Sequence, residues 1–174
     1  RQEEAVPEQV EQEKYDMATL LFYRLLEMIE QRRLAVYNLF VSKMEYKEIK
    51  YNTRRAPEFA GLPKDSQFEL LKQKVQDIKA KIFGKGNNYL PEQVSLLEGF
   101  ILLYALKDPI VADKDGHGID QLKRIRAMVF LRNNSIFAHG LGPVGISDFK
   151  KFQAFVLEIF EQFCSIEKIN YKEY

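Results

Sequence analysis

The chain has 174 residues, of which 46% are hydrophobic and 29% are charged, and its formal net charge at pH 7 is +1. This balance is typical of one folded domain and excludes a disordered, collagen-like or disulfide-stapled protein. The small net charge also argues against the broad basic surface with which some proteins coat nucleic acid, so any polyanion must be bound locally.

Cys164 is the only cysteine, so no internal disulfide can form, and its apolar neighbours indicate a buried thiol. A reducing cytoplasm suits such a chain. The longest apolar run, residues 99–106, is far too short to cross a membrane. We therefore expect a cytoplasmic protein with neither a membrane span nor a signal peptide.

The chain opens with an acidic, glutamine-rich stretch that ends at Asp16. We interpret residues 1–16 as a linker leading into the first helix and residues 17–174 as the helical domain. Because the sequence begins with Arg1 rather than Met, we expect it to be a fragment of a longer protein.

The first helix is expected from about Pro7 to Phe40, because proline favours the first turn of a helix and a dense apolar zone follows it. Its apolar residues cover more than the single stripe of a surface helix. A partner helix or a second subunit must therefore cover it.

The next segment, residues 44–61, is irregular. Glu45 to Tyr51 could form a short strand or an extended arm, and we treat it as a loop. A helix capped by Asp65 or Ser66 and ended by Gly84 follows, because apolar residues recur there at steps of three and four.

Three more helices are expected. Pro91 opens the third, which is apolar nearly all round and therefore central, and the fourth covers residues 119–138. Ser147 caps the fifth, whose phenylalanines recur at the spacing of a core rather than of a platform for bases. The sequence thus predicts an all-α bundle of about five main helices.

Positive charge is concentrated in residues 43–85, which hold eleven Lys and Arg against six Asp and Glu. The interpretation that we favour for this excess is a solvated helix face.

The fourth helix carries the most informative pattern. Its inward positions step through Leu122, Ile125 and Val129 and continue through Arg132, Ile136 and His139. Burial of an unpaired guanidinium or imidazole is costly, so either both are paired in a network or the helix end opens into a cleft. Seven residues separate Arg132 from His139, about two turns and roughly 10 Å, so both side chains leave one face.

The stretch Arg132-Asn133-Asn134-Ser135-Ile136-Phe137-Ala138-His139-Gly140 resembles the signature of HEPN ribonucleases, an Arg, a polar residue and then a His. It looks more closely like the effector domain of the CRISPR type III ancillary ribonucleases, whose sensor half is a CARF domain. The resemblance implies that residues 17–174 are the C-terminal effector domain of a longer protein. Leu21 to Glu27 also resembles the opening helix of that effector domain, and the similarity covers most of the chain from Asp16 onward.

The resemblance implies metal-free cleavage of single-stranded RNA, in which the ribose 2′-hydroxyl attacks the adjacent phosphate. Arg132 and His139 would be catalytic, and Asn133 would orient the backbone or the ligand. No metal or cofactor is expected. Members of this family form one cleft from two copies of the helix, so we expect a homodimer, and in the full-length protein a CARF sensor that binds cyclic oligoadenylate as part of antiviral defence.

Two alternatives stay open: a noncatalytic helical module that dimerises or binds RNA, and a HEPN toxin nuclease outside CRISPR. Other sites are disfavoured. The acidic loop around His117 has Arg124 where a calcium loop needs a glutamate, and residues 84–86 lack the spacing of a phosphate-binding loop. Catalysis by Cys164 with a histidine is unsupported because that thiol is expected to be buried.

Overall fold

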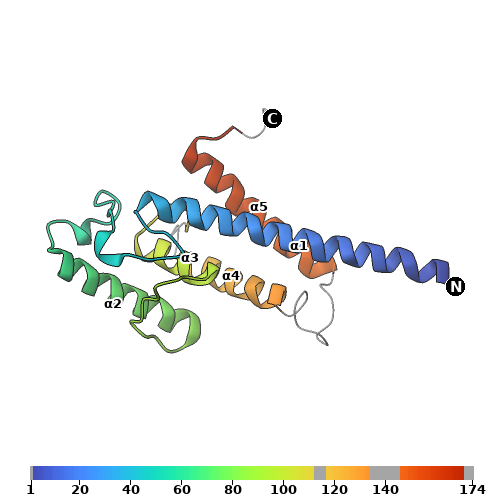
Figure 1. The fold of residues 1–174 in the computed structure, drawn as a ribbon, viewed down its shortest axis with the longest axis horizontal. Helices are drawn as coiled ribbons and strands as arrows, with labels where there is room; N and C mark the ends of the chain where they lie inside the picture. The colour runs from blue at the N-terminus through green and yellow to red at the C-terminus, as the bar shows by residue number, and fades with distance from the viewer. Residues whose placement is uncertain (1, 112–116, 134–145, 171–174) are drawn as a thin grey trace. The chain divides into compact units, whose positions relative to one another are not determined.

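The computed structural model describes residues 2–111, 117–133 and 146–170. Within these ranges it contains α-helices and short 3₁₀ helices and no strand, which confirms the all-α prediction. The elements, which Figure 1 shows in chain order, are α1 (Gln2–Val36), η1 (Tyr46–Glu48), η2 (Pro57–Phe59), α2 (Lys64–Phe83), α3 (Leu96–Ala105), α4 (Gly118–Arg132) and α5 (Ile146–Glu167).

The chain divides into two compact units. One unit contains Arg1–Met28 and Arg126–Tyr174, so it holds most of α1, the last turns of α4, and α5. The other is Ile29–Ile125, which holds the end of α1, η1, η2, α2, α3 and the start of α4. The boundary predicted between residues 16 and 17 stays a prediction.

Helix α3 lies at the centre of the Ile29–Ile125 unit, as its all-round apolar sequence predicted. Seven of its ten residues are buried: Leu96, Gly99, Phe100, Ile101, Leu102, Leu103 and Ala105. Gly99 is required by a close approach, because a Cβ at this position would lie 2.0 Å from Oε2 of the buried Glu30 on α1. A larger residue would therefore force the buried Glu30 side chain to move.

A buried carboxylate joins the end of α1 to the turn after α3. Asp108 is 1% exposed and accepts hydrogen bonds from Nη2 of Arg33 at 2.6 Å and from Nε at 3.1 Å. Its oxygens also accept from the Tyr37 hydroxyl at 2.6 Å and from the backbone N–H of Ile110 at 3.0 Å. Because the charge is paired and bonded on both oxygens, its burial is tolerated.

In the other unit, aromatic side chains of α5 pack on α1. The Phe22 ring centroid lies 6.0 Å from that of Phe149 and 6.2 Å from that of Phe152. Phe152, Phe155, Val156, Ile159 and Cys164 are buried. This confirms that the phenylalanines of α5 belong to a core and that the thiol is buried.

Helix α1 begins at Gln2, earlier than the predicted start at Pro7. Residues 2–16, interpreted from the sequence as a linker, are therefore helical. Their composition is rich in glutamate and glutamine, which are good helix formers, and this favours continuation of the helix toward the N-terminus.

The extended arm considered for Glu45 to Tyr51 is wrong, because Tyr46–Glu48 forms the 3₁₀ helix η1. Tyr46 is buried there and its hydroxyl donates to the carbonyl of Pro91. Pro91 was also wrongly expected to open the third helix. The backbone N–H of Met44 donates to the carbonyl of Glu92 and that of Val94 donates to the carbonyl of Val41, and residues 91–95 are not helical.

The helix ends were predicted unevenly. Gly84 ends α2 in a left-handed conformation with φ of 80°, as expected. However, α3 is capped by Ser95, whose side chain accepts from the N–H of Glu98. The predicted cap at Asp65 or Ser66 lies inside α2, whose first residue follows Pro63, and Ser147 lies inside α5. The predicted caps lie within two residues of the observed starts of α2 and α5. Local sequence preference does not separate positions that are so close, so packing decides among them.

We expect Asp108→Asn to lower the free energy of unfolding by about 3–5 kcal/mol, because it removes the negative charge that Asp108 places against the buried Arg33. Urea denaturation followed by circular dichroism measures the change. Asp120→Asn is the control, since this carboxylate is 67% exposed and its loss should change stability by less than about 0.5 kcal/mol. Equal midpoints for the two variants would show that the Asp108 network does not hold the unit together.

Candidate functional site

Burial declines along the predicted inward face of α4. Leu122 and Ile125 are fully buried, whereas Val129 and Arg132 are only partly buried. Arg132 is the last residue of α4 as its bounds are drawn. The Arg132 side chain is therefore partly exposed where this helix face reaches solvent, although its Nε atom is buried.

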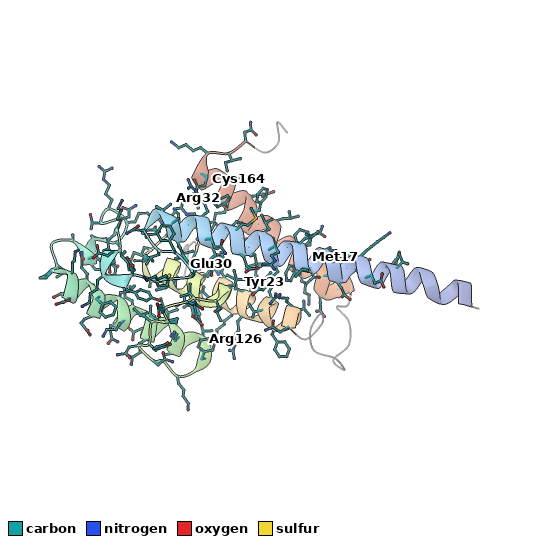
Figure 2. All side chains as sticks on the ribbon, in the orientation of Figure 1. Met17, Tyr23, Glu30, Arg32, Arg126 and Cys164 are labelled. Carbon is teal, nitrogen blue, oxygen red and sulfur yellow. The ribbon has the colours of Figure 1, made fainter. Side chains whose placement is uncertain are left out.

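Tyr23 of α1 lies beneath the guanidinium. The Arg132 Cζ atom is 4.3 Å from the centroid of the Tyr23 ring, and Tyr23 itself is 7% exposed. Both residues belong to the same compact unit, and Figure 2 labels Tyr23 on α1. A cation over an aromatic face at this distance is attracted by the ring, by roughly 0.5–2 kcal/mol depending on desolvation. The buried ring thus fixes the direction of the Arg132 side chain, whose methylene chain is long and flexible.

Asn133 contacts the same guanidinium. Its Oδ1 atom accepts from Nη1 of Arg132 at 3.4 Å, a long hydrogen bond. Arg132, Asn133 and Tyr23 therefore form one cluster. His139 lies outside the described residues, so its position two turns beyond Arg132 stays a prediction, as do the catalytic roles of all of these residues.

Tyr23 was missed as a site residue by sequence reasoning, which treated it as part of an apolar surface. Its neighbours Phe22 and Arg24 give no local signal that its ring would meet a guanidinium more than a hundred positions away. Only the proximity of α1 and the end of α4 within this unit reveals the contact.

The other histidine and the acidic residues form no comparable cluster in the part of the chain that the structure describes. His117 is 72% exposed, and its Nδ1 lies 3.9 Å from Oδ2 of Asp120. Among those residues, no three or more His, Cys, Asp or Glu side chains are grouped as metal ligands would be. None of the described helices is long and apolar enough to cross a membrane.

The chain matches the model of a known family. The model of the Csm6 HEPN domain matches residues 6–163, which is most of the chain and includes Tyr23, Arg132 and the predicted position of His139. The chain belongs to the Csm6 HEPN domain family. Membership implies an RNase-type function in a CRISPR context. Neither a curated protein nor a solved structure matches this HEPN domain.

The contact between Tyr23 and Arg132 predicts a spectroscopic signature in this HEPN domain. The ring current of Tyr23 should shift the Nε–H proton resonance of Arg132 upfield, because the guanidinium lies over the ring face. Tyr23→Leu should remove the shift and Tyr23→Phe should keep it. Two-dimensional NMR measures the shift, with Arg132→Lys identifying the signal, and an unshifted resonance in the unaltered protein would contradict the stacked geometry.

Proposed function

We propose that this HEPN domain is a metal-independent endoribonuclease that cleaves single-stranded RNA, with Arg132 and His139 as its catalytic pair. The observation that supports this most directly is a guanidinium held by the buried Tyr23 ring while it stays partly exposed to solvent. A cation held in this way can meet a phosphate without first being reorganised, which is the condition for electrostatic stabilisation of a transition state.

In the proposed reaction a base removes the proton of a ribose 2′-hydroxyl, and that oxygen attacks the adjacent phosphorus. The bond from phosphorus to the 5′-oxygen breaks, and the leaving oxygen takes up a proton. The products are a 2′,3′-cyclic phosphate and a 5′-hydroxyl end. Arg132 stabilises the negative charge on the phosphoryl oxygens, and His139 carries a proton because imidazole titrates near neutral pH. DNA lacks the attacking hydroxyl.

Arg132→Ala and His139→Ala should each reduce cleavage of unstructured RNA by about 10²–10⁴-fold in the presence of EDTA. The matched controls are Lys123→Ala, an exposed cation of the same helix, and His117→Ala, the other histidine, both of which should cleave normally. Mass spectrometry of the products should find cyclic phosphate ends. Full cleavage by either site variant would refute the mechanism. Cleavage by the unaltered protein only after metal is added would refute it as well.

One Arg and one His provide few groups for two proton transfers, so we infer that two copies of the chain complete the site. The structure offers a suitable surface on α1. Met17, Leu21 and Met28 are 58%, 63% and 67% exposed, and their spacing of four and seven residues places them on one side of the helix. An exposed apolar stripe of this kind is suited to an interface between two copies, and a twofold axis would make it self-complementary.

Leu21→Glu should convert a dimer to a monomer and abolish cleavage, because it places a charge at the middle of the apolar stripe on α1. Multi-angle light scattering measures the mass, and the cleavage assay measures activity. Leu157→Glu is the control, since this exposed apolar residue lies on α5 instead. A Leu21→Glu protein that remains dimeric would show that the dimer uses another surface.

In the full-length protein, a CARF sensor that binds cyclic oligoadenylate would control this activity during antiviral defence. The match to the Csm6 HEPN domain supports the CRISPR setting of this proposal.

A further inference from the structure

A second candidate binding site lies in the Ile29–Ile125 unit. In the sequence it is far from Arg132 and His139, the residues proposed for catalysis. It is an open pocket of about 380 Å³ formed by the end of α1 and the connection that leads from α1 to α2, drawn in cyan in Figure 1. Its lining residues are Val36, Tyr37, Lys50, Tyr51, Asn52, Thr53 and Arg54. No acidic residue is among them.

The backbone of this pocket is held by local hydrogen bonds. Oδ1 of Asn52 accepts from the N–H groups of Arg54 and Arg55 at 3.2 and 3.3 Å, and the Asn52 carbonyl accepts from Ala56 at 2.8 Å. The N–H of Lys50 donates to the carbonyl of Tyr37 at 3.0 Å, which ties the turn to the end of α1. The positions from which the side chains leave are therefore fixed without a ligand.

The cations of this region fall into two groups. Five lysines of the Ile29–Ile125 unit pair with carboxylates: Lys47 with Asp65, Lys64 with Glu48, Lys72 with Glu69, and both Lys74 and Lys107 with Glu58. By contrast, Lys50 and Arg54 are exposed, and within the described residues their side chains make neither an ion pair nor a hydrogen bond. The pocket thus concentrates positive charge that the protein itself does not neutralise.

Apolar and aromatic surface accompanies these cations. The Tyr51 ring stacks on the buried Phe59, with centroids 4.3 Å apart, and Val36 is 45% exposed. Burial raises the pKa of Tyr51 to about 12, so its hydroxyl stays neutral at pH 7 and adds no negative charge. Free cations beside apolar surface are complementary to a nucleotide, which joins an anionic phosphate to a sugar and a flat base.

We propose that this pocket binds one nucleotide unit of a single-stranded RNA, with Lys50 and Arg54 on its phosphate and the surface of Val36 and Tyr51 against its sugar or base. The volume is within the range of pockets that hold small molecules, which fits one nucleotide. That the ligand is RNA rests on the proposed ribonuclease function. The pocket adds to it a place that holds the strand independently of the catalytic pair.

Binding of a short single-stranded RNA with methylated 2′-hydroxyls, which cannot be cleaved by the proposed route, tests this by fluorescence anisotropy. Lys50→Ala combined with Arg54→Ala should weaken binding on the order of tenfold or more, because charge-assisted hydrogen bonds to phosphate are lost. The slope of log affinity against log salt should fall by about 0.7 for each lost phosphate contact. Thermal unfolding should be unchanged, since both side chains are exposed.

Lys43→Ala combined with Lys81→Ala is the matched control. These lysines are also exposed and without ion pairs among the described residues, but they do not line the pocket. Their double substitution removes the same charge as the pocket variant does. Their loss should weaken binding no more than about twofold at physiological salt, where charges far from a ligand are screened. Equal losses in the two double variants, or no loss in the pocket variant, would overturn the proposal.

Competition with adenosine monophosphate distinguishes a strand from a free nucleotide. If the mononucleotide displaces the methylated RNA at equal molar concentration, the ligand is a mononucleotide and the proposal of a strand site is wrong. Unmethylated RNA separates the two functions. If cleavage requires Arg132 and His139 but the pocket variant binds the strand normally, the pocket proposal is wrong and the ribonuclease proposal stands. Pocket-dependent binding without cleavage by the unaltered protein instead supports the pocket and overturns the ribonuclease.

Discussion

The buried carboxylate of Asp108 is the constraint on which the Ile29–Ile125 unit depends. It must be bonded on both oxygens to be stable in a protein interior, and Arg33, Tyr37 and the Ile110 backbone supply those bonds. These donors come from the end of α1 and from the turn after α3, so the network fixes the relation of the two elements. Gly99 then allows α3 to pack closely on Glu30 of α1, which places the central helix.

Charged residues in this unit serve two different purposes. Glu58 joins Lys74 of α2 to Lys107 after α3; burial alone would raise its pKa, but the hydrogen bonds from these lysines hold the pKa at about 2. Cations of this first kind are neutralised by carboxylates, and these ion pairs join different parts of the unit. Lys50 and Arg54 are the second kind, because they line a pocket and no described carboxylate pairs with them. What distinguishes these two from other cations without an ion pair among the described residues, such as Lys43 and Lys81, is that they line the pocket.

Arg132 combines both properties in the other unit. Its guanidinium stacks on the buried Tyr23 ring and bonds to Asn133, which restricts its motion, and it nevertheless remains partly exposed. An aromatic ring is well suited to this task because it attracts a cation without cancelling its charge. The Csm6 HEPN family model spans both Tyr23 and Arg132, and the proposed RNA cleavage depends on the fixed positive charge of Arg132.

The sequence alone determined that this HEPN domain is helical, that α3 is central, that the phenylalanines of α5 form a core and that Gly84 ends α2, because each of these follows from periodicity or local backbone preference. It also identified Arg132 as unusual, since a guanidinium stands in an apolar register. The start of α3 at Ser95 was also encoded locally, because Ser95 and Glu98 stand at the spacing of a capping box, but the proline at position 91 was preferred to it. The tertiary structure alone decided that Tyr23 supports Arg132 and that Lys50 and Arg54 share a pocket with the end of α1. Those outcomes depend on contacts between residues far apart in the chain, which no local pattern encodes.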